Sequence, residues 1–103
     1  MNLYNEVIEE LKDHKKTVKD IIFIACDNKL ISVDEFMGYA RNFDYDEGFG
    51  TNYVNPALII VGDNWWLERH EYDGSEWFEF KTIPVKPTEK LENIDDVNYY
   101  YDK

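Results

Sequence analysis

The sequence predicts an α+β domain in which a mostly antiparallel sheet of about five strands packs against two helices. Three observations lead to this class. Apolar residues recur at helical spacing in two stretches, two short runs are apolar on both alternating sets of positions, and an Asp-Gly step joins two aromatic, alternating runs. The expected order is helix, two strands, helix, three strands. Residues 1–87 form the single predicted domain, and residues 88–103 form an acidic, tyrosine-rich tail.

The first helix is expected over residues 3–13. Its apolar positions, which include Leu3, Val7 and Leu11, recur at helical spacing, while glutamates and a lysine fill the opposite side. Asn2 precedes the first apolar position and has a side chain suited to cap the helix. The segment is therefore predicted to be amphipathic, with one face directed to a core.

Two further runs are predicted to be strands. Residues 18–26 and 57–61 are apolar on both alternating sets, a pattern typical of strands that are covered on both faces. Asp27 and Asn28 favour a turn, which leads into a short strand at residues 29–31. We therefore expect the two longer runs to lie in the interior, with apolar contacts above and below them.

The second helix begins at a capping signal. Ser32 and Glu35 have the Ser-x-x-Glu spacing in which each side chain satisfies a free backbone N–H at the helix start. Apolar positions then continue to about residue 42. Residues 43–56 combine glycine, proline, aromatic and acidic residues, a composition that favours an ordered loop.

The aromatic hairpin is the most specific feature of the chain. Asp73 and Gly74 predict a two-residue turn, so Tyr72 pairs with Ser75 across the hairpin. Each residue before Tyr72 then pairs with the corresponding residue after Ser75. Opposed residues share a face, which separates the side chains into two sets. The apolar set consists of Trp65, Leu67, Phe78 and Phe80. The other set, which we call the aromatic-acidic face, consists of Trp66, Glu68, His70, Tyr72, Trp77 and Glu79.

The aromatic-acidic face allows two interpretations. Exposed tryptophan and tyrosine beside charge are typical of protein-binding hot spots, because a ring gives a large contact area with few rotors to freeze. Alternatively, a helix covers this face and its aromatic residues belong to the core. Glu68 opposite Glu79 would destabilise the strand pair unless a cation, from Lys81 or from a partner, lies between them.

The composition limits the partners. The 103-residue chain has 22 acidic and 11 basic side chains and a formal charge of −11, so nucleic acid and anionic membranes are poor partners. An acidic surface favours a basic protein, because opposite charges steer the encounter. The N-terminus lacks a signal-peptide pattern, and no apolar segment reaches the roughly 20 residues of a membrane span. Cys26 is the only cysteine, which fits a reducing cytosol.

No residue pattern predicts catalysis. Cys26 lies within a predicted strand, and the serines lie at a helix cap and beside a turn, so none is placed as a nucleophile. Glu68, His70 and Glu79 have the residue types of a metal site, but without a second histidine they are more typical of a solvated polar patch. Residues 44–48 resemble the start of a calcium loop whose closing glutamate is absent. We therefore predict no catalytic residue, no metal and no cofactor.

Acidic and aromatic residues also alternate in the 43–56 loop and in the tail. Carboxylates spaced along a surface can occupy the phosphate-binding groups of a nucleic-acid-binding protein, while rings fill its base pockets. Asp44, Asp46 and Glu47 are therefore included among the predicted partner-binding residues. The alternative is ordinary solubilising charge.

The hairpin string from Trp65 to Trp77, preceded by residues 58–63 and 43–50, resembles a family of small acidic proteins encoded by phages and prophages of Gram-positive bacteria. The similarity runs from about residue 14 to residue 87. The resemblance implies no catalytic residues. It does imply a biological context, because small acidic phage proteins often bind and disable host machinery, including CRISPR nucleases and other defence complexes.

We therefore expect a non-enzymatic inhibitor that acts in the bacterial cytosol and blocks a basic, nucleic-acid-handling host protein such as a CRISPR nuclease. Two alternatives stay open. The first is a small-ligand or metal-binding domain built on the aromatic-acidic face. The second is a structural or assembly accessory protein that self-associates through the same face.

Overall fold

The computed structural model describes residues 1–46 and 52–100 of the chain. It confirms the predicted α+β class and the predicted order of elements, with a five-stranded antiparallel sheet and two α-helices. In chain order the elements are α1 (Leu3–Asp13), the 3₁₀ turn η1 (Val18–Asp20), β1 (Ile21–Cys26), β2 (Lys29–Ile31), α2 (Val33–Ala40), β3 (Ile59–Gly62), β4 (Trp65–Tyr72), β5 (Ser75–Thr82) and the 3₁₀ turn η2 (Ile94–Val97).

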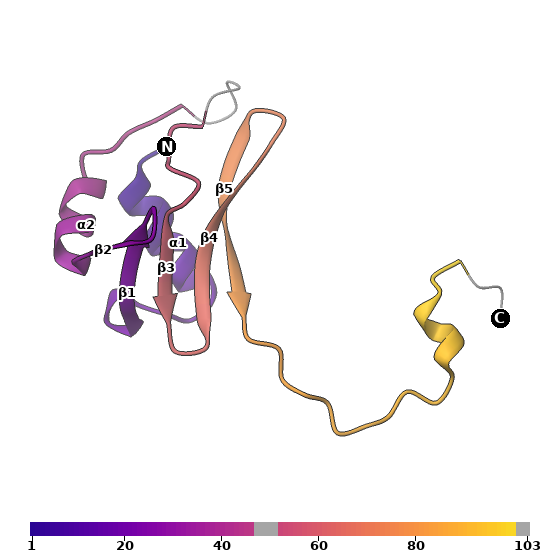
Figure 1. Ribbon diagram of the computed structural model, residues 1–103. Helices are drawn as coiled ribbons and strands as arrows, with labels where there is room; N and C mark the ends of the chain where they lie inside the picture. Colours follow the sequence, from indigo (N-terminus) through magenta and orange to yellow (C-terminus); the bar gives the residue numbers. More distant parts are fainter. Residues whose placement is uncertain (47–51, 101–103) are drawn as a thin grey trace.

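The strands lie in the order β2-β1-β3-β4-β5, and every neighbouring pair is antiparallel. A tight turn at Asp27 and Asn28 joins β1 to β2, with φ angles of 51° and 66° in the left-handed region that aspartate and asparagine tolerate. The chain then passes through α2 and returns to the other side of β1, where β3 is added (Figure 1). β2 and β5 are the two edges of the sheet.

One core joins both helices to a single face of the sheet, which we call the covered face. Its members include Leu3, Val7 and Leu11 of α1, Phe36, Met37 and Ala40 of α2, and Ile24, Ile60, Leu67 and Phe78 of the strands. These strand residues belong to one alternating set, because the ladder aligns Ile24 with Ile60 and Ile60 with Leu67. Within the described part of the chain both α-helices therefore pack on this side. The opposite side, which we call the open face, bears the other alternating set.

The prediction that β1 and β3 are covered on both faces is wrong. Phe23 is 39% exposed and the neighbouring Ile22 is 64% exposed, while Ile59 and Val61 are half-buried. Covering these residues would need a second layer, and α1 and α2 both lie on the covered face. The apolar residues on both alternating sets therefore give the sheet an apolar open face.

β1 also begins later than predicted, because residues 18–20 form the 3₁₀ turn η1. The Asp20 carboxylate accepts hydrogen bonds from the backbone N–H and the hydroxyl of Thr17, at 2.8 and 3.3 Å. These local bonds compete with the extended conformation. β3 likewise begins at Ile59, slightly after the predicted start at Ala57.

The helix starts agree with the predicted caps. The Asn2 side chain accepts a hydrogen bond from the backbone N–H of Asn5 at 3.0 Å, and the Ser32 hydroxyl accepts one from Glu35 at 2.9 Å. The bounds of α1 are those predicted. α2 ends at Ala40, slightly earlier than the expected end near residue 42.

The structure confirms the predicted register of the hairpin at every pair from Trp66 with Lys81 to Tyr72 with Ser75. Asp73 and Gly74 have φ angles of 50° and 84°. Positive φ at both central positions is the mark of a type I′ turn, whose twist matches that of the flanking strands. The turn therefore fixes which hairpin side chains enter the core and which project from the open face.

The chain leaves the domain after β5. Residues 83–100 are exposed, and they run away from the sheet and helices (Figure 1). Within this tail Asn93 caps η2 by accepting a hydrogen bond from the backbone N–H of Asp95 at 3.0 Å.

Candidate functional site

All six residues of the aromatic-acidic face project from the open face of the sheet. The ladder pairs Trp66 with Lys81, Glu68 with Glu79, His70 with Trp77 and Tyr72 with Ser75. Trp66 and Trp77 are half-buried, and Tyr72 is 77% exposed. The interpretation in which a helix covers these rings is therefore wrong, since α1 and α2 both pack on the covered face.

Each indole is held by a carboxylate of its own strand. Trp66 Nε1 donates a hydrogen bond to Glu68 Oε1 at 2.6 Å, and Trp77 Nε1 donates one to Glu79 Oε2 at 3.1 Å. The polar edge of each ring is thus satisfied within the molecule. The apolar area that the rings expose is therefore available for contact without leaving an indole N–H unpaired.

His70 lies between the two facing carboxylates. Its Nε2 is 2.7 Å from Glu68 Oε2, and its Nδ1 is 3.6 Å from Glu79 Oε2. Lys81 Nζ lies 3.0 Å from Glu79 Oε1. Lys81 thus supplies, from within the chain, the cation that the opposition of Glu68 and Glu79 requires.

The hydrogen bonds keep both carboxylates ionised. The hydrogen bond from Trp66 is the largest cause that lowers the pKa of Glu68, and the one from His70 is the next largest. For Glu79, the hydrogen bond from Lys81 is the largest cause that lowers the pKa, and the one from Trp77 is the next largest. The aromatic-acidic face therefore presents negative charge at neutral pH, even with Lys81 beside it.

The sheet extends this face with apolar residues that the sequence analysis did not include. Phe23 is aligned with Val61, and Val61 with Trp66; Ala25 is aligned with Ile59 in the next row. An apolar strip of the inner strands thus lies directly beside Trp66. The sequence signal for this strip is the pair of runs that are apolar on both alternating sets, a pattern that predicts a covering layer instead.

The loop carboxylates lie elsewhere. Asp44 Oδ1 accepts a hydrogen bond from the Asn2 side chain at 2.8 Å, beside the N-terminus of α1. Asp46 is exposed, two residues further along the same segment. Glu47 lies outside the described residues. The structure therefore does not bring Asp44 together with the hairpin residues on the open face.

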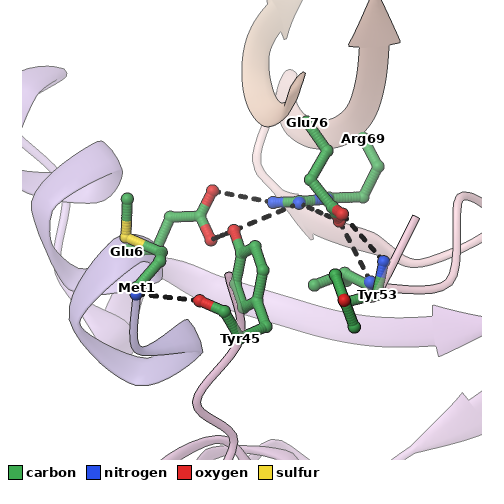
Figure 2. Close-up of polar contacts among 7 residues, drawn as sticks. Met1, Glu6, Tyr45, Tyr53, Arg69 and Glu76 are labelled. Atoms are coloured by element: carbon green, nitrogen blue, oxygen red, sulfur yellow. Dashed lines mark hydrogen bonds and ion pairs between the residues drawn. The ribbon is translucent and has the colours of Figure 1, made fainter. Parts of the chain in front are cut away.

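The covered face holds a buried ion-pair network that the sequence analysis missed (Figure 2). Arg69 Nη1 lies 2.8 Å from Glu6 Oε2 of α1, and Arg69 Nη2 lies 2.7 Å from Glu76 Oε1 of β5. The hydroxyl of Tyr45 donates to Glu6. The backbone oxygen of Tyr45 accepts a hydrogen bond from the Met1 ammonium at 2.9 Å.

Glu76 also anchors the segment that follows the undescribed loop residues. Its two carboxylate oxygens accept hydrogen bonds from the backbone N–H groups of Tyr53 and Val54, at 2.7 and 3.0 Å. Burial acts to raise the pKa of Glu76, but these two donors and Arg69 outweigh it, and the net effect is a lowered pKa. The network is enclosed and ties α1, the hairpin and this segment together, so its role is structural.

The described residues show little reactive chemistry. They contain no group of three metal-ligating side chains placed to hold an ion. Cys26 is partly buried, and burial raises the pKa of its thiol, which weakens it as a nucleophile. No helix in the described ranges is long and apolar enough to cross a bilayer.

No protein family, curated protein or solved structure matches this chain. The resemblance to small acidic phage proteins therefore stays a prediction.

Proposed function

We propose that this protein is a non-enzymatic inhibitor that binds a basic, nucleic-acid-handling protein in the bacterial cytosol and blocks it. The docking surface is the aromatic-acidic face together with its apolar border of Phe23, Ile59 and Val61. The resemblance to small acidic phage proteins supplies the class of partner, for which a CRISPR nuclease or another defence complex is the example.

One observation carries the proposal. Trp66 and Trp77 project from a sheet face that neither α-helix covers. Tryptophan is among the residues most enriched at binding hot spots, where it fills desolvated pockets on the partner. Because each indole N–H already bonds to a neighbouring carboxylate, docking freezes little further motion of the rings and costs less conformational entropy.

The charge of the face supports a basic partner. Glu68 and Glu79 are ionised beside the rings, and the whole chain has a formal charge of −11. Such a field accelerates the approach of a positively charged surface. A protein whose own ligand is nucleic acid carries a surface of that kind, and occupying it would exclude the nucleic acid.

The proposed surface does not include the loop acids. Asp44 bonds to Asn2 at the N-terminus of α1, away from the open face. Asp46 belongs to the same segment, and Glu47 lies outside the described residues. The hairpin residues thus make up the polar part of the surface by themselves.

The proposal is tested by capture from a nuclease-treated bacterial lysate on the immobilised full chain. The Trp66→Ala/Trp77→Ala variant should lose the basic proteins that the wild type retains. Tyr99→Ala/Tyr100→Ala is the matched control, because it removes two aromatic rings that are 96% exposed and lie on the tail. That control should retain the same proteins as the wild type.

A captured protein is then purified and titrated directly. Its affinity should fall as salt is raised, and a DNA or RNA ligand of that protein should compete with the chain for it. Equal capture by the wild type and the double tryptophan variant would remove the open face from the proposal. Simultaneous binding of nucleic acid and the chain would remove the blocking mechanism.

A further inference from the structure

A second surface of the molecule has the opposite charge. A groove of about 500 Å³ lies between the C-terminal end of α1 and η1. Ile8, Leu11 and Val18 supply its apolar lining, and Lys12, Lys16 and Lys19 add three positive charges. These are three of the 11 basic residues in a chain that has 22 acidic ones, so the groove is a local concentration of positive charge.

The lysines of the groove form no ion pair in the part of the chain that the structure describes. Within residues 1–46 and 52–100, the structure pairs none of the three with a carboxylate within 4.0 Å. The nearby Asp20 carboxylate is engaged with Thr17 at the start of η1. Lys16 Nζ lies 5.9 Å from the centroid of the Trp65 ring. The groove therefore combines an apolar lining with positive charge that is open to an acidic ligand.

The tail has the complementary chemistry. Leu91, Ile94 and Val97 are exposed, and Glu92 and Asp95 alternate with them. Ile94 and Val97 lie on the same side of η2, because residues three apart superimpose along a 3₁₀ helix. An apolar edge flanked by carboxylates matches the lining and the lysines of the groove.

We propose that the 89–97 segment of one molecule docks into the α1–η1 groove of a second copy of this chain. The apolar edge of η2 meets Ile8, Leu11 and Val18, and the tail carboxylates meet the lysines. The tail runs away from its own domain in the structure (Figure 1) and contributes no residue to its own groove, and we therefore place it in the groove of a neighbouring molecule. The contact joins two different surfaces, so it is heterologous and produces a ring or a chain of molecules.

The association is independent of the open face, and charge reversal tests it. The groove variant is Lys12→Glu/Lys19→Glu, and the tail variant is Glu92→Lys/Asp95→Lys. All four side chains are exposed, so the fold should tolerate the changes, and circular dichroism with thermal unfolding checks it. Lys29→Glu/Lys86→Glu is the matched control, since it changes the net charge as the groove variant does but lies outside both surfaces.

Sedimentation velocity over a range of protein concentrations provides the measurement. The wild type and the control should increase in mass with concentration, and high salt should reverse the increase. Each reversed variant alone should associate at least about tenfold more weakly than the wild type. This change is equivalent to about 1.4 kcal/mol or more in the free energy of association. An equimolar mixture of the two should recover the association, because each tail then meets a groove of opposite charge.

Several outcomes would overturn the proposal. One is a wild type that stays monomeric at every concentration, and another is a mixture that fails to recover the association. A third is association that survives both reversals but is abolished by Trp66→Ala/Trp77→Ala, which would assign self-association to the open face. A tail that docks into its own groove would leave the mass constant, and this result also contradicts the proposal.

Discussion

Arg69 Nη2 lies 2.7 Å from Glu76 Oε1 inside the covered face, and this contact holds β4 and β5 to the segment of Tyr53 and Val54. The side chains of both residues are almost fully buried, at 2% and 3% exposed. A pair in this position contributes little net stability over apolar residues of the same volume, but removing one partner leaves an uncompensated charge.

Arg69→Met should destabilise the protein strongly, because Glu6 and Glu76 would remain buried without their cation. We expect a loss of about 3–5 kcal/mol in the free energy of unfolding, measured by urea denaturation. Glu9→Gln is the control, since Glu9 is an exposed carboxylate of α1 outside the network, and its change should stay within about 0.5 kcal/mol. Equal effects of the two substitutions would show that the network does not stabilise the fold.

The stability of the protein should fall in acid because of Glu76. Its pKa in the folded state is lowered from 4.5, so this carboxylate contributes stability above about pH 4.5 that is lost as the pH falls through the folded-state pKa. Glu76→Gln should reduce stability at neutral pH and flatten the acid limb of the stability profile. Parallel profiles of the variant and the wild type would contradict this assignment.

Replacing Gly62 or Gly38 with alanine should change the stability of the protein in opposite directions. A Cβ built on Gly62 would lie 2.0 Å from Cε2 of the buried Trp65 ring, so Gly62→Ala should cost about 1–3 kcal/mol through overpacking. Gly38 lies within α2, and nothing lies within 4 Å of its added Cβ. Gly38→Ala should therefore stabilise the protein by about 0.5–1 kcal/mol through helix propensity. Thermal unfolding of both variants provides the comparison.

Lys81→Gln should leave Glu68 and Glu79 facing each other with less compensation. Because these side chains are partly exposed, we expect only a small loss of stability, and high salt should remove most of it. Adding Glu79→Gln to Lys81→Gln should recover the loss, since the repulsion then disappears. A loss that is independent of salt would indicate that Lys81 acts through packing of its aliphatic stem.

The hairpin was predictable because its information is local. Asp73 and Gly74 fix the turn, the turn fixes the register, and the register places Trp66 and Trp77 on one face. The α1 bounds were likewise set by short-range periodicity and the Asn2 cap. Each of these features depends on residues close together in the chain.

The buried network was not found because its partners are brought together only by the fold. Glu6 and Arg69 lie far apart in the sequence, and helical periodicity gives Glu6 no partner on the sheet. Part of the signal was nevertheless available. The predicted register places Arg69 opposite Phe78 and diagonal to Glu76 on the apolar side, where a charge needs a counter-charge.

The sequence does not specify the open face, for a different reason. An apolar run such as residues 57–61 predicts that its side chains are buried, but it does not indicate which part of the molecule or which partner covers them. Two helices were predicted, and nothing in their sequences specified which side of the sheet they would occupy. The sequence therefore predicts covered positions for Phe23 and Val61, whereas on the open face Val61 lies beside Trp66 and Phe23 lies beside Val61.

The position of β5 limits how the sheet can grow. In the described part of the chain β5 has a neighbour on one side only, which is the arrangement that invites a foreign strand and leads to edge-to-edge aggregation. Pro84 follows almost directly and has no backbone N–H to donate, so hydrogen-bonded pairing cannot continue regularly beyond the eight residues of β5. Glu79 and Lys81 add charge along the same strand. An incoming segment must therefore be short and must match this charge pattern, and this requirement protects the protein from indiscriminate polymerisation.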